Sequence, residues 1–393
     1  MSKADFDVII IGGGIHGAGA AQAAVAQGYK VAVLEQSAIA SGTSSRSSKL
    51  IHGGLRYLES GQISLVRECL RERRLLLKNA PELVTLKKFY IPVYEHTKRQ
   101  ALTIRAGLSL YSLLAAPGPG SRFHHIPKRK WDMLDGLQTE GLKAVYQYWD
   151  AQTDDAALTE AVMNSATELG ATLYVPAIVS SVEEIDDGFQ VCFSDNNEQH
   201  FIHGKLIVNA AGPWANQLLD RVNPRQVKRS MDLVQGTHIV LNGTVEQGIY
   251  YLEAPSDGRA VFAMPWKGQL MVGTTEQLYK GDPSEVAPTE AEQQYLLNTL
   301  KHYFPKYKNA GIADITKSFA GLRVLPSADK SAFSRPRETV LHTNHVDAPG
   351  IVTIYGGKLT AYRATSERLM KVIAPSLPKR DPVANTRKIK LTK

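Results

Sequence analysis

Hydrophobic and polar positions near the N-terminus follow the order strand, helix, strand. Residues 6–11 (FDVIII) form an apolar run, which is typical of a strand buried on both faces of a parallel sheet. Residues 12–28 are rich in alanine and predict a helix that ends at Gly28. Residues 29–35 (YKVAVLE) predict the next strand. Together they predict a strand–helix–strand unit with a right-handed parallel crossover.

Apolar positions at helical spacing predict several more helices along the chain. Pro81 stops the first of them, and Gly170 ends the second. Their predicted ranges are 63–81, 153–170, 288–304 and 358–374. The chain therefore alternates strands and helices, as an α/β protein does.

The pattern changes between about residues 228 and 275. Four strand-like runs with polar turns between them follow one another closely: THIVL, GIYYLE, RAVFAMPW and QLMVGTT. Such runs predict an antiparallel sheet, and here a second domain inserted into the first. A length of 393 residues agrees with two packed domains.

Cysteine usage and the N-terminus bear on the cellular setting. Cys69 and Cys192 are too few for a disulfide framework or a four-thiolate metal site, so we expect a reducing environment and no metal centre. The first residues show no secretion-signal pattern, so we expect a cytoplasmic protein. Only the basic segment after Pro375 is a candidate for disorder.

The formal net charge is +8, which nucleic acid, an anionic membrane surface or an anionic small substrate would each explain. A mildly basic solvated surface is the simpler alternative. The chain has no zinc-finger spacing and no basic run with interleaved aromatic residues, so we expect no nucleic-acid partner.

One apolar segment, residues 98–118, opens with Lys98 and Arg99 and then carries mostly apolar residues. It falls short of the about 18 consecutive apolar residues that a spanning helix needs. It fits either a core helix or a helix that lies on a membrane surface.

The glycine motif Gly12-x-Gly14-x-x-Gly17 follows the first predicted strand and opens the first predicted helix. Glu35 ends the next strand, where it would accept hydrogen bonds from a ribose. Gly12 permits the tight turn, Gly14 lets a pyrophosphate approach the backbone, and Gly17 lets the helix and strand pack closely. The free N–H groups of the helix N-terminus favour phosphate. The alternative is a glycine-rich turn without a ligand.

Two later segments favour FAD over NAD. Residues 206–219 (LIVNAAGPWANQLL) run from an apolar strand into a turn of small residues, and residues 356–363 (GGKLTAYR) form a second glycine-rich junction. A cofactor that reaches from Gly12 to Gly356 suits FAD. Lys358 beside a helix N-terminus would stabilise the negative charge that hydride transfer places on the flavin ring.

Several segments resemble, in this order, the FAD-dependent glycerol-3-phosphate dehydrogenases and oxidases: GGGIHGAG, TSSRSSKLIHGGLRYLES, VNAAGPW, GTHIVL, MPWKGQLMVGTTEQLYKGDP, GLRVLPS and YGGKLTAYR. The second and fifth are the most specific. The resemblance covers residues 6–374. Members of this family usually continue into a further C-terminal helical domain, which the printed sequence lacks.

The resemblance implies a glutathione-reductase-type FAD-binding Rossmann domain with an inserted antiparallel β-sheet substrate domain, an α/β (α+β) fold. The expected FAD-binding domain comprises residues 1–80, 150–225 and 345–375, the substrate domain residues 81–149 and 226–344, and the basic tail residues 376–393.

The implied reaction oxidises sn-glycerol 3-phosphate to dihydroxyacetone phosphate and passes electrons to a quinone or another acceptor such as oxygen. Quinone-linked members lie on the inner face of the cytoplasmic membrane, and residues 98–118 match the position of their membrane helix. One alternative is a related FAD enzyme acting on another phosphorylated, hydroxy-acid or amino-acid substrate. Another is a non-catalytic flavoprotein with the same fold.

The loop around residues 43–54 is expected to cover the cofactor, with Gly53 and Gly54 keeping side chains off the ring. The residues expected to bind FAD are Gly12, Gly14, Gly17, Glu35, Gln36, Thr43, Ser44, Ser45, Lys49, Leu50, Val179, Ala211, Gly212, Trp214, Lys358, Leu359 and Thr360.

A phosphate ester calls for arginine, which offers planar, bidentate donors. Arg323 and Arg337 match the family's phosphate-holding positions, and Arg335 competes for the second role. Arg56 and Tyr57 are expected to line the same cavity. Alcohol oxidation also needs a base, and three candidates stay open. They are His52, His238 and Lys358.

Overall fold

The predicted strand–helix–strand unit forms the centre of one sheet. The computed structural model describes residues 4–115, 117–118, 120–196, 198–327 and 339–393. Strand β1 (Phe6–Ile11) leads into helix α1 (Ile15–Ala26) and then β2 (Val31–Leu34), which pairs with β1 in parallel. On its other side β1 pairs in parallel with β10 (Glu198–Asn209). The predicted strand–helix–strand order and the parallel pairing of its two strands are confirmed.

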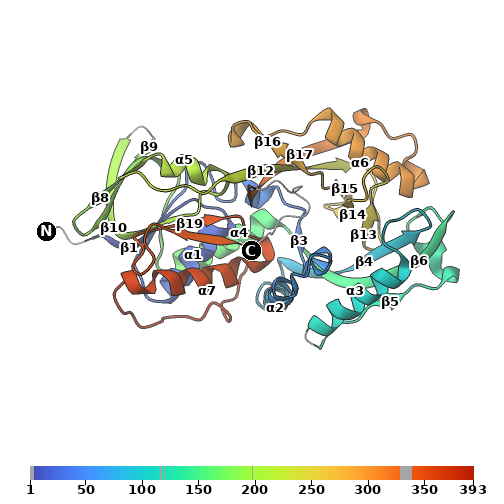
Figure 1. Cartoon of the computed structure of the whole chain (residues 1–393), viewed down its shortest axis with the longest axis horizontal. Helices are drawn as coiled ribbons and strands as arrows, with labels where there is room; N and C mark the ends of the chain where they lie inside the picture. Colours follow the sequence, from blue (N-terminus) through green and yellow to red (C-terminus); the bar gives the residue numbers. More distant parts are fainter. Residues whose placement is uncertain (1–3, 116, 119, 197, 328–338) are drawn as a thin grey trace.

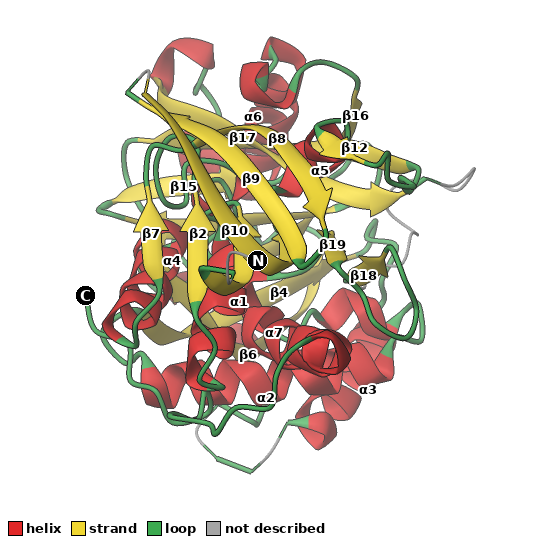
Figure 2. Cartoon of the chain, turned by 90° about the vertical axis from the view of Figure 1, so that its left-hand side faces the viewer, coloured by secondary structure: helices red, strands yellow, loops and turns green. Residues whose placement is uncertain are grey.

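Within the described residues this first sheet has nine strands. An antiparallel meander runs from β8 to β10 and faces the viewer in Figure 2. The remaining strands are β7 (Thr172–Tyr174), β8 (Ile178–Ile185), β9 (Gly188–Asp195), β11 (Val222–Asn223), β18 (Val340–Thr343) and β19 (Ile351–Tyr355).

The second sheet lies beside the first along the long axis of the molecule (Figure 1). Antiparallel pairs join β12 to β15, β14 to β15 and β13 to β14, as the closely spaced runs predict. Its strands are β3 (Leu50–Ile51), β4 (Val84–Tyr94), β5 (His124–His125), β6 (Leu142–Thr153), β12 (Met231–Leu241), β13 (Ile249–Glu253), β14 (Ala260–Trp266), β15 (Gln269–Gly273), β16 (Gln277–Tyr279) and β17 (Ile315–Pro326).

Two predicted boundaries differ from this sheet membership. Strand β3 and the end of β6 pair with each other in the second sheet, although both were assigned to the first domain. Strand β18 pairs with β19 in the first sheet, although it was assigned to the second domain. In both places the pairing of a short strand decides the sheet to which it belongs, and local sequence patterns do not reveal that pairing.

Helix α1 is almost entirely buried between the first sheet and two other helices. A Cβ atom at Gly19 would lie 2.7 Å from the ring of Tyr362 in α7, so this glycine permits close helix packing. The other helices are α2 (Ile63–Asn79), α3 (Ala101–Leu114), α4 (Asp155–Glu168), α5 (Ala215–Leu219), α6 (Glu290–Tyr303) and α7 (Tyr362–Ile373).

Helix α3 covers the second sheet and also exposes apolar side chains. Ile104, Leu108 and Tyr111 are buried, whereas Leu102 and Leu113 are each 80% exposed. Within the part of the chain that the structure describes, no helix has the length and apolar character that a bilayer crossing demands. The helix therefore buries one face, as a core helix does, and exposes two leucines, as a helix lying on a membrane surface would.

The C-terminal segment is folded, so the expectation of disorder after Pro375 is wrong. The N–H of Val383 donates to the carbonyl oxygen of Ala26, and Leu391 is buried and bonds to Asn79 through its N–H group. Arg380 forms an ion pair with Asp7. These contacts tie the segment to the first domain despite its basic composition.

Candidate active site

A cavity with a volume of about 880 Å³ draws its walls from both sheets. The start of α1, the loop after β2, the turn after β10 and the turn before α7 supply one part of its lining. Strands β12, β14 and β17 supply another part. Segments that are far apart in the sequence, and that its motifs single out, therefore meet around one space.

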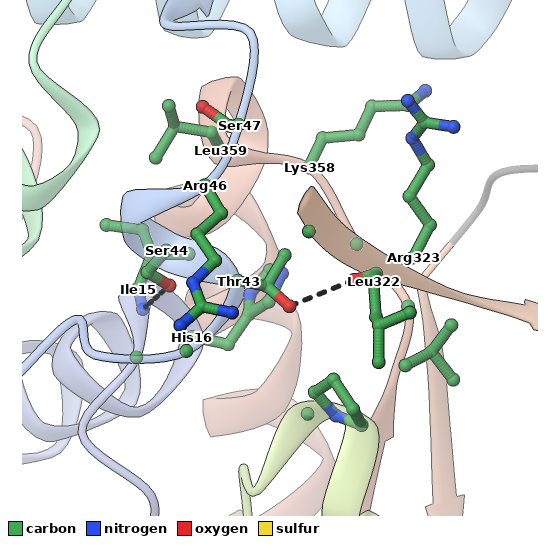
Figure 3. Close-up of a pocket in the computed structure, with 18 of the residues that line it drawn as sticks. Ile15, His16, Thr43, Ser44, Arg46, Ser47, Leu322, Arg323, Lys358 and Leu359 are labelled. Carbon is green, nitrogen blue, oxygen red and sulfur yellow. Dashed lines mark hydrogen bonds between the residues drawn. The ribbon is translucent and has the colours of Figure 1, made fainter. Parts of the chain in front are cut away.

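The start of α1 forms one end of this cavity (Figure 3). The N–H of Ile15 donates to Ser44 Oγ at 2.9 Å, and the N–H of Gly13 donates to Glu35 Oε2 at 2.6 Å. Glu35 Oε1 accepts the N–H of Ser37 at 3.0 Å. A carboxylate has about four acceptor positions, so Glu35 keeps capacity for a ribose hydroxyl.

The glycines at this end leave no room for side chains. A Cβ atom at Gly12, where φ is +115°, would lie 2.6 Å from the carbonyl oxygen of Ala210. A Cβ atom at Gly17 would lie 1.8 Å from the carbonyl oxygen of Gly12. Glycine is thus required at both positions. Gly12 and Gly14 line the cavity, so backbone faces it at the helix N-terminus, where phosphate binds readily.

Three predicted FAD-binding residues do not line the cavity. Gly17 packs against the preceding turn, in agreement with its predicted packing role. Ser45 donates its hydroxyl to the carbonyl oxygen of Gly42. Lys49 is buried and forms an ion pair with Asp155 at 2.6 Å, so its ammonium points to α4 instead of the cavity.

The other predicted FAD-binding residues do line the cavity. They are Gly12, Gly14, Glu35, Gln36, Thr43, Ser44, Leu50, Val179, Ala211, Gly212, Trp214, Lys358, Leu359 and Thr360. Thr43 in the short helix η1 (Thr43–Ser45) also donates its hydroxyl to the carbonyl oxygen of Leu322 at 2.9 Å. That bond joins the loop around residues 43–54 to β17.

The turn before α7 brings Lys358 to the loop that carries Arg56 and Tyr57. The ammonium of Lys358 lies 3.9 Å from the centre of the Tyr57 ring, and the guanidinium of Arg56 lies 5.9 Å from the same centre. A Cβ atom at Gly357, where φ is +109°, would lie 2.0 Å from His16 Nε2. Glycine is therefore required in this turn.

His52 lines the cavity beside these cations. Burial lowers its pKa below the ordinary value of 6.5; the charge of Asp150 opposes this shift, and Lys358 and Arg56 add to it. The imidazole is therefore neutral near pH 7, which is the form that can accept a proton.

His238 also lines the cavity but is more enclosed. Its Nε2 hydrogen-bonds to Ser48 Oγ at 2.9 Å, and its ring stacks on Phe319 with centres 4.9 Å apart. Burial, followed by the charges of Arg323 and Lys49, lowers its pKa to about 3. His238 is thus a weak base held by its neighbours.

Arg323 comes from β17 and donates to Thr274 Oγ1 at 3.2 Å. A Cβ atom at Gly236 would lie 2.6 Å from its guanidinium, so a glycine makes room for it. In Figure 3 the side chains of Arg323 and Lys358 extend the same way, away from the start of α1. Arg337 and its competitor Arg335 lie outside the described residues.

The lining also contains four basic residues that the sequence patterns did not single out: His16, Arg46, Arg221 and Arg259. His16 lies in the segment GGGIHGAG and Arg46 in TSSRSSKLIHGGLRYLES, so the sequence offered a signal for both. Arg221 and Arg259 carry no local signal, since only the fold brings them to the cavity.

Positive charge prevails in this lining. Among the described residues the charged side chains are Arg46, Arg56, Arg221, Arg259, Arg323 and Lys358 against Glu35 and Glu276. Such a lining favours anionic ligands, including a diphosphate and a phosphate ester.

A dinucleotide-type helix start, a second glycine turn and a cation-lined cavity between two sheets define an FAD-dependent oxidoreductase. The family model described as DAO, FAD dependent oxidoreductase, matches residues 7–363, and the chain belongs to this family. The predicted family fold and the predicted cofactor, FAD, are confirmed.

Among its relatives are glycerol-3-phosphate dehydrogenases. The chain is 35% identical over 389 residues to the aerobic glycerol-3-phosphate dehydrogenase of Staphylococcus saprophyticus, covering 96% of this chain and 68% of that protein. The FAD complex of a Bacillus halodurans glycerol-3-phosphate dehydrogenase is similar, with a TM-score of 0.75 at 28% identity, covering 100% of this chain and 68% of that one.

An L-alpha-glycerophosphate oxidase from Mycoplasma pneumoniae, with FAD bound, shares the fold. Its TM-score is 0.78 at 18% identity, over 99% of both chains. At this identity the likeness supports the fold alone.

Proposed function

We propose that the chain oxidises sn-glycerol 3-phosphate to dihydroxyacetone phosphate. The observation that carries this proposal is one cavity lining that combines Arg323, Lys358 and Arg56 with the neutral His52. Cations suit a phosphate ester, and a neutral imidazole suits a hydroxyl proton. The names of the 34–35% identical relatives support the same substrate.

The residues at the other end of the cavity fit FAD. The backbone of Gly12 and Gly14, which lines the cavity at the start of α1, suits the diphosphate, and Glu35 has acceptor capacity for the ribose. When bound, FAD supplies the hydride acceptor, flavin N5. Lys358, at the start of the short helix η9 (Leu359–Ala361), supplies positive charge for the ring edge that becomes negative.

Arg323 is proposed to hold the substrate phosphate. It is held by Thr274 and seated over Gly236, so its guanidinium is oriented before a ligand arrives. Preorganised donors lose less entropy on binding than mobile ones do. Arg56 and Tyr57 stay proposed substrate contacts, because both line the same cavity.

Of the three candidate bases, we propose His52. His238 already uses Nε2 in a hydrogen bond to Ser48, and its pKa of about 3 makes it a poor proton acceptor. Lys358 lies against the Tyr57 ring, which suits a fixed ammonium. His52 would take the hydroxyl proton while the hydride leaves the substrate C2 atom.

The electron acceptor is proposed to be a quinone, with oxygen as the alternative. The exposed Leu102 and Leu113 of α3 fit peripheral contact with an anionic membrane surface. Flotation with phosphatidylglycerol vesicles tests this contact, and loss of binding on Leu102→Ser with Leu113→Ser is the expected result.

The proposed reaction is tested by identifying its product. Purified FAD-loaded protein is given glycerol 3-phosphate and an artificial electron acceptor, and the product is analysed by mass spectrometry. Dihydroxyacetone phosphate is the expected product. Turnover of glycine or glycerol, with no turnover of glycerol 3-phosphate, would overturn the proposal.

A further inference from the structure

Two consecutive backbone N–H groups beside the proposed base are bonded to side chains from remote elements. The N–H of His52 donates to Thr360 Oγ1 at 3.1 Å, and the N–H of Gly53 donates to Tyr111 Oη at 2.8 Å. They follow β3 directly and precede the short helix η2 (Leu55–Leu58). Side chains, not a strand partner, therefore hold this turn in place.

Tyr111 comes from α3 and makes a second contact through the same hydroxyl. Its Oη lies 2.8 Å and 3.0 Å from the two carboxylate oxygens of Asp150. Arg73 also forms an ion pair with Asp150 and donates to the carbonyl oxygen of Trp149 at 2.7 Å. The exposed fractions of Tyr111, Asp150 and Arg73 are 4%, 1% and 6%.

This arrangement fixes the direction of each hydrogen bond. An Asp150 carboxylate paired with Arg73 can only accept, and a tyrosine hydroxyl has one proton to donate. That proton goes to Asp150, which leaves an oxygen lone pair of Tyr111 for the N–H of Gly53. A buried N–H group without an acceptor is costly, so the bond constrains Gly53.

The seat of Gly53 is also sterically tight. A Cβ atom there would lie 2.5 Å from Tyr111 Oη and 2.8 Å from the Leu70 side chain. The next residue, Gly54, has a φ of +79°. The backbone between His52 and Arg56 is thus constrained by the hydrogen bond to the Tyr111 hydroxyl, by the close approach of the Leu70 side chain and by the left-handed conformation of Gly54.

We infer that Tyr111 is a positioning residue for the reaction, backed by Asp150 and Arg73, which seats Gly53 and so aims the imidazole of His52 into the cavity. Because this inference assigns a role relative to His52, it rests on the proposed function. Tyr111 itself does not line the cavity, so it acts through the turn.

The test compares Tyr111→Phe with a matched control. Phenylalanine keeps the ring and removes only the hydroxyl. Tyr94→Phe makes the same change at another buried tyrosine, whose hydroxyl donates to the carbonyl oxygen of Gln138 outside the cavity. Both variants are prepared with FAD, and amide hydrogen exchange at Gly53 is measured along with anaerobic flavin reduction by glycerol 3-phosphate.

Tyr111→Phe is expected to speed exchange at Gly53 roughly tenfold and to slow flavin reduction at saturating substrate roughly tenfold, as the loss of one buried hydrogen bond predicts. The FAD content and the substrate concentration at half-maximal rate are expected to stay within about twofold of the wild type, because the binding residues are untouched. Tyr94→Phe is expected to leave the Gly53 exchange and the reduction rate unchanged.

Unchanged exchange at Gly53 in Tyr111→Phe, or faster exchange with an unchanged reduction rate, overturns the inference. Should that variant not fold, exchange in the wild type decides: less than about tenfold protection of the Gly53 amide means that no such bond holds it. A wild-type flavin that glycerol 3-phosphate does not reduce counts against the proposed function instead.

Discussion

The ammonium of Lys358 lies 3.9 Å from the centre of the Tyr57 ring. This cation–π contact joins the glycine turn before α7 to the loop after β3, although 301 positions separate the two residues. It holds a positive charge at the cavity wall beside His52, whose pKa Lys358 lowers further. The charge is thus in place before any ligand binds.

Removal of this charge is expected to make the flavin harder to reduce. In Lys358→Met the two-electron reduction potential of bound FAD falls by roughly 30–60 mV, since 30 mV corresponds to about 1.4 kcal/mol. Equilibration with a redox dye measures the potential. Lys306→Met is the matched control, because Lys306 lies 5.2 Å from the Tyr307 ring and does not line the cavity. An equal shift in both variants contradicts the assignment.

Arg323→Ala is expected to weaken the reaction with the phosphorylated substrate. Loss of a seated guanidinium costs about 2 kcal/mol or more, so kcat/KM falls roughly 30-fold or further. Steady-state kinetics measure this loss, and the flavin spectrum checks that FAD is retained. Arg225→Ala alters an exposed arginine outside the cavity and is expected to behave as the wild type. Equal kinetics for both variants would show that Arg323 does not hold the substrate.

The pH dependence of flavin reduction separates the two candidate histidines. A base must be neutral to accept a proton, and the pKa of His52 lies below 6.5. The rate of flavin reduction is therefore expected to be maximal near pH 7 and to decline as the pH falls through that lowered pKa. His52→Gln slows reduction roughly 100-fold and removes this decline. Rapid mixing at several pH values measures the rate of flavin reduction in the wild type and in each variant. A decline that persists in His52→Gln and vanishes in His238→Gln would make His238 the base.

Buried histidines also predict how the stability depends on pH. Burial lowers the pKa of His16 to about 4 and of His238 to about 3, whereas unfolded histidine titrates near 6.5. Between these values the unfolded chain binds more protons than the folded one. The contribution to stability is therefore complete above pH 6.5 and shrinks as the pH falls, by about 1.4 kcal/mol per pH unit for each histidine.

Urea unfolding at about pH 6 and about pH 5 measures this slope. His238→Gln is expected to reduce it by about 1.4 kcal/mol per pH unit, because the titration of one buried histidine is removed. His345→Gln changes an exposed histidine and is expected to keep the wild-type slope. If His238→Gln has the wild-type slope, His238 is not held neutral by the fold.

The sequence predicts the parts of this protein that short-range patterns encode. The run of β1, the glycines at the start of α1 and Glu35 at the end of β2 together specify the first sheet and the FAD end. Gly12 and Glu35 belong to one strand–helix–strand unit, and this unit needs residue types that are easy to recognise at its first turn and after its second strand. The antiparallel second sheet follows from evenly spaced apolar runs in the same way.

Contacts between remote segments are not encoded locally. Lys49 looks like a cofactor contact in its serine-rich loop. In the structure its ammonium forms a buried ion pair with Asp155, which lies 106 residues further along the chain. Tyr111 looks like one apolar position of a surface helix, and only the fold brings its hydroxyl to Gly53. Arg259 enters the cavity from the turn just before β14 of the second sheet, without a motif of its own.

Glycerol 3-phosphate is proposed to be the hydride donor in this cavity. Anaerobic mixing of the FAD-loaded protein with glycerol 3-phosphate tests this proposal most directly, by following flavin absorbance at about 450 nm. Glycerol 3-phosphate is expected to bleach the flavin rapidly, and glycerol and glycine are expected not to, because neither carries the phosphate that Arg323 is proposed to hold. Bleaching by glycine or glycerol, with no response to glycerol 3-phosphate, would contradict it.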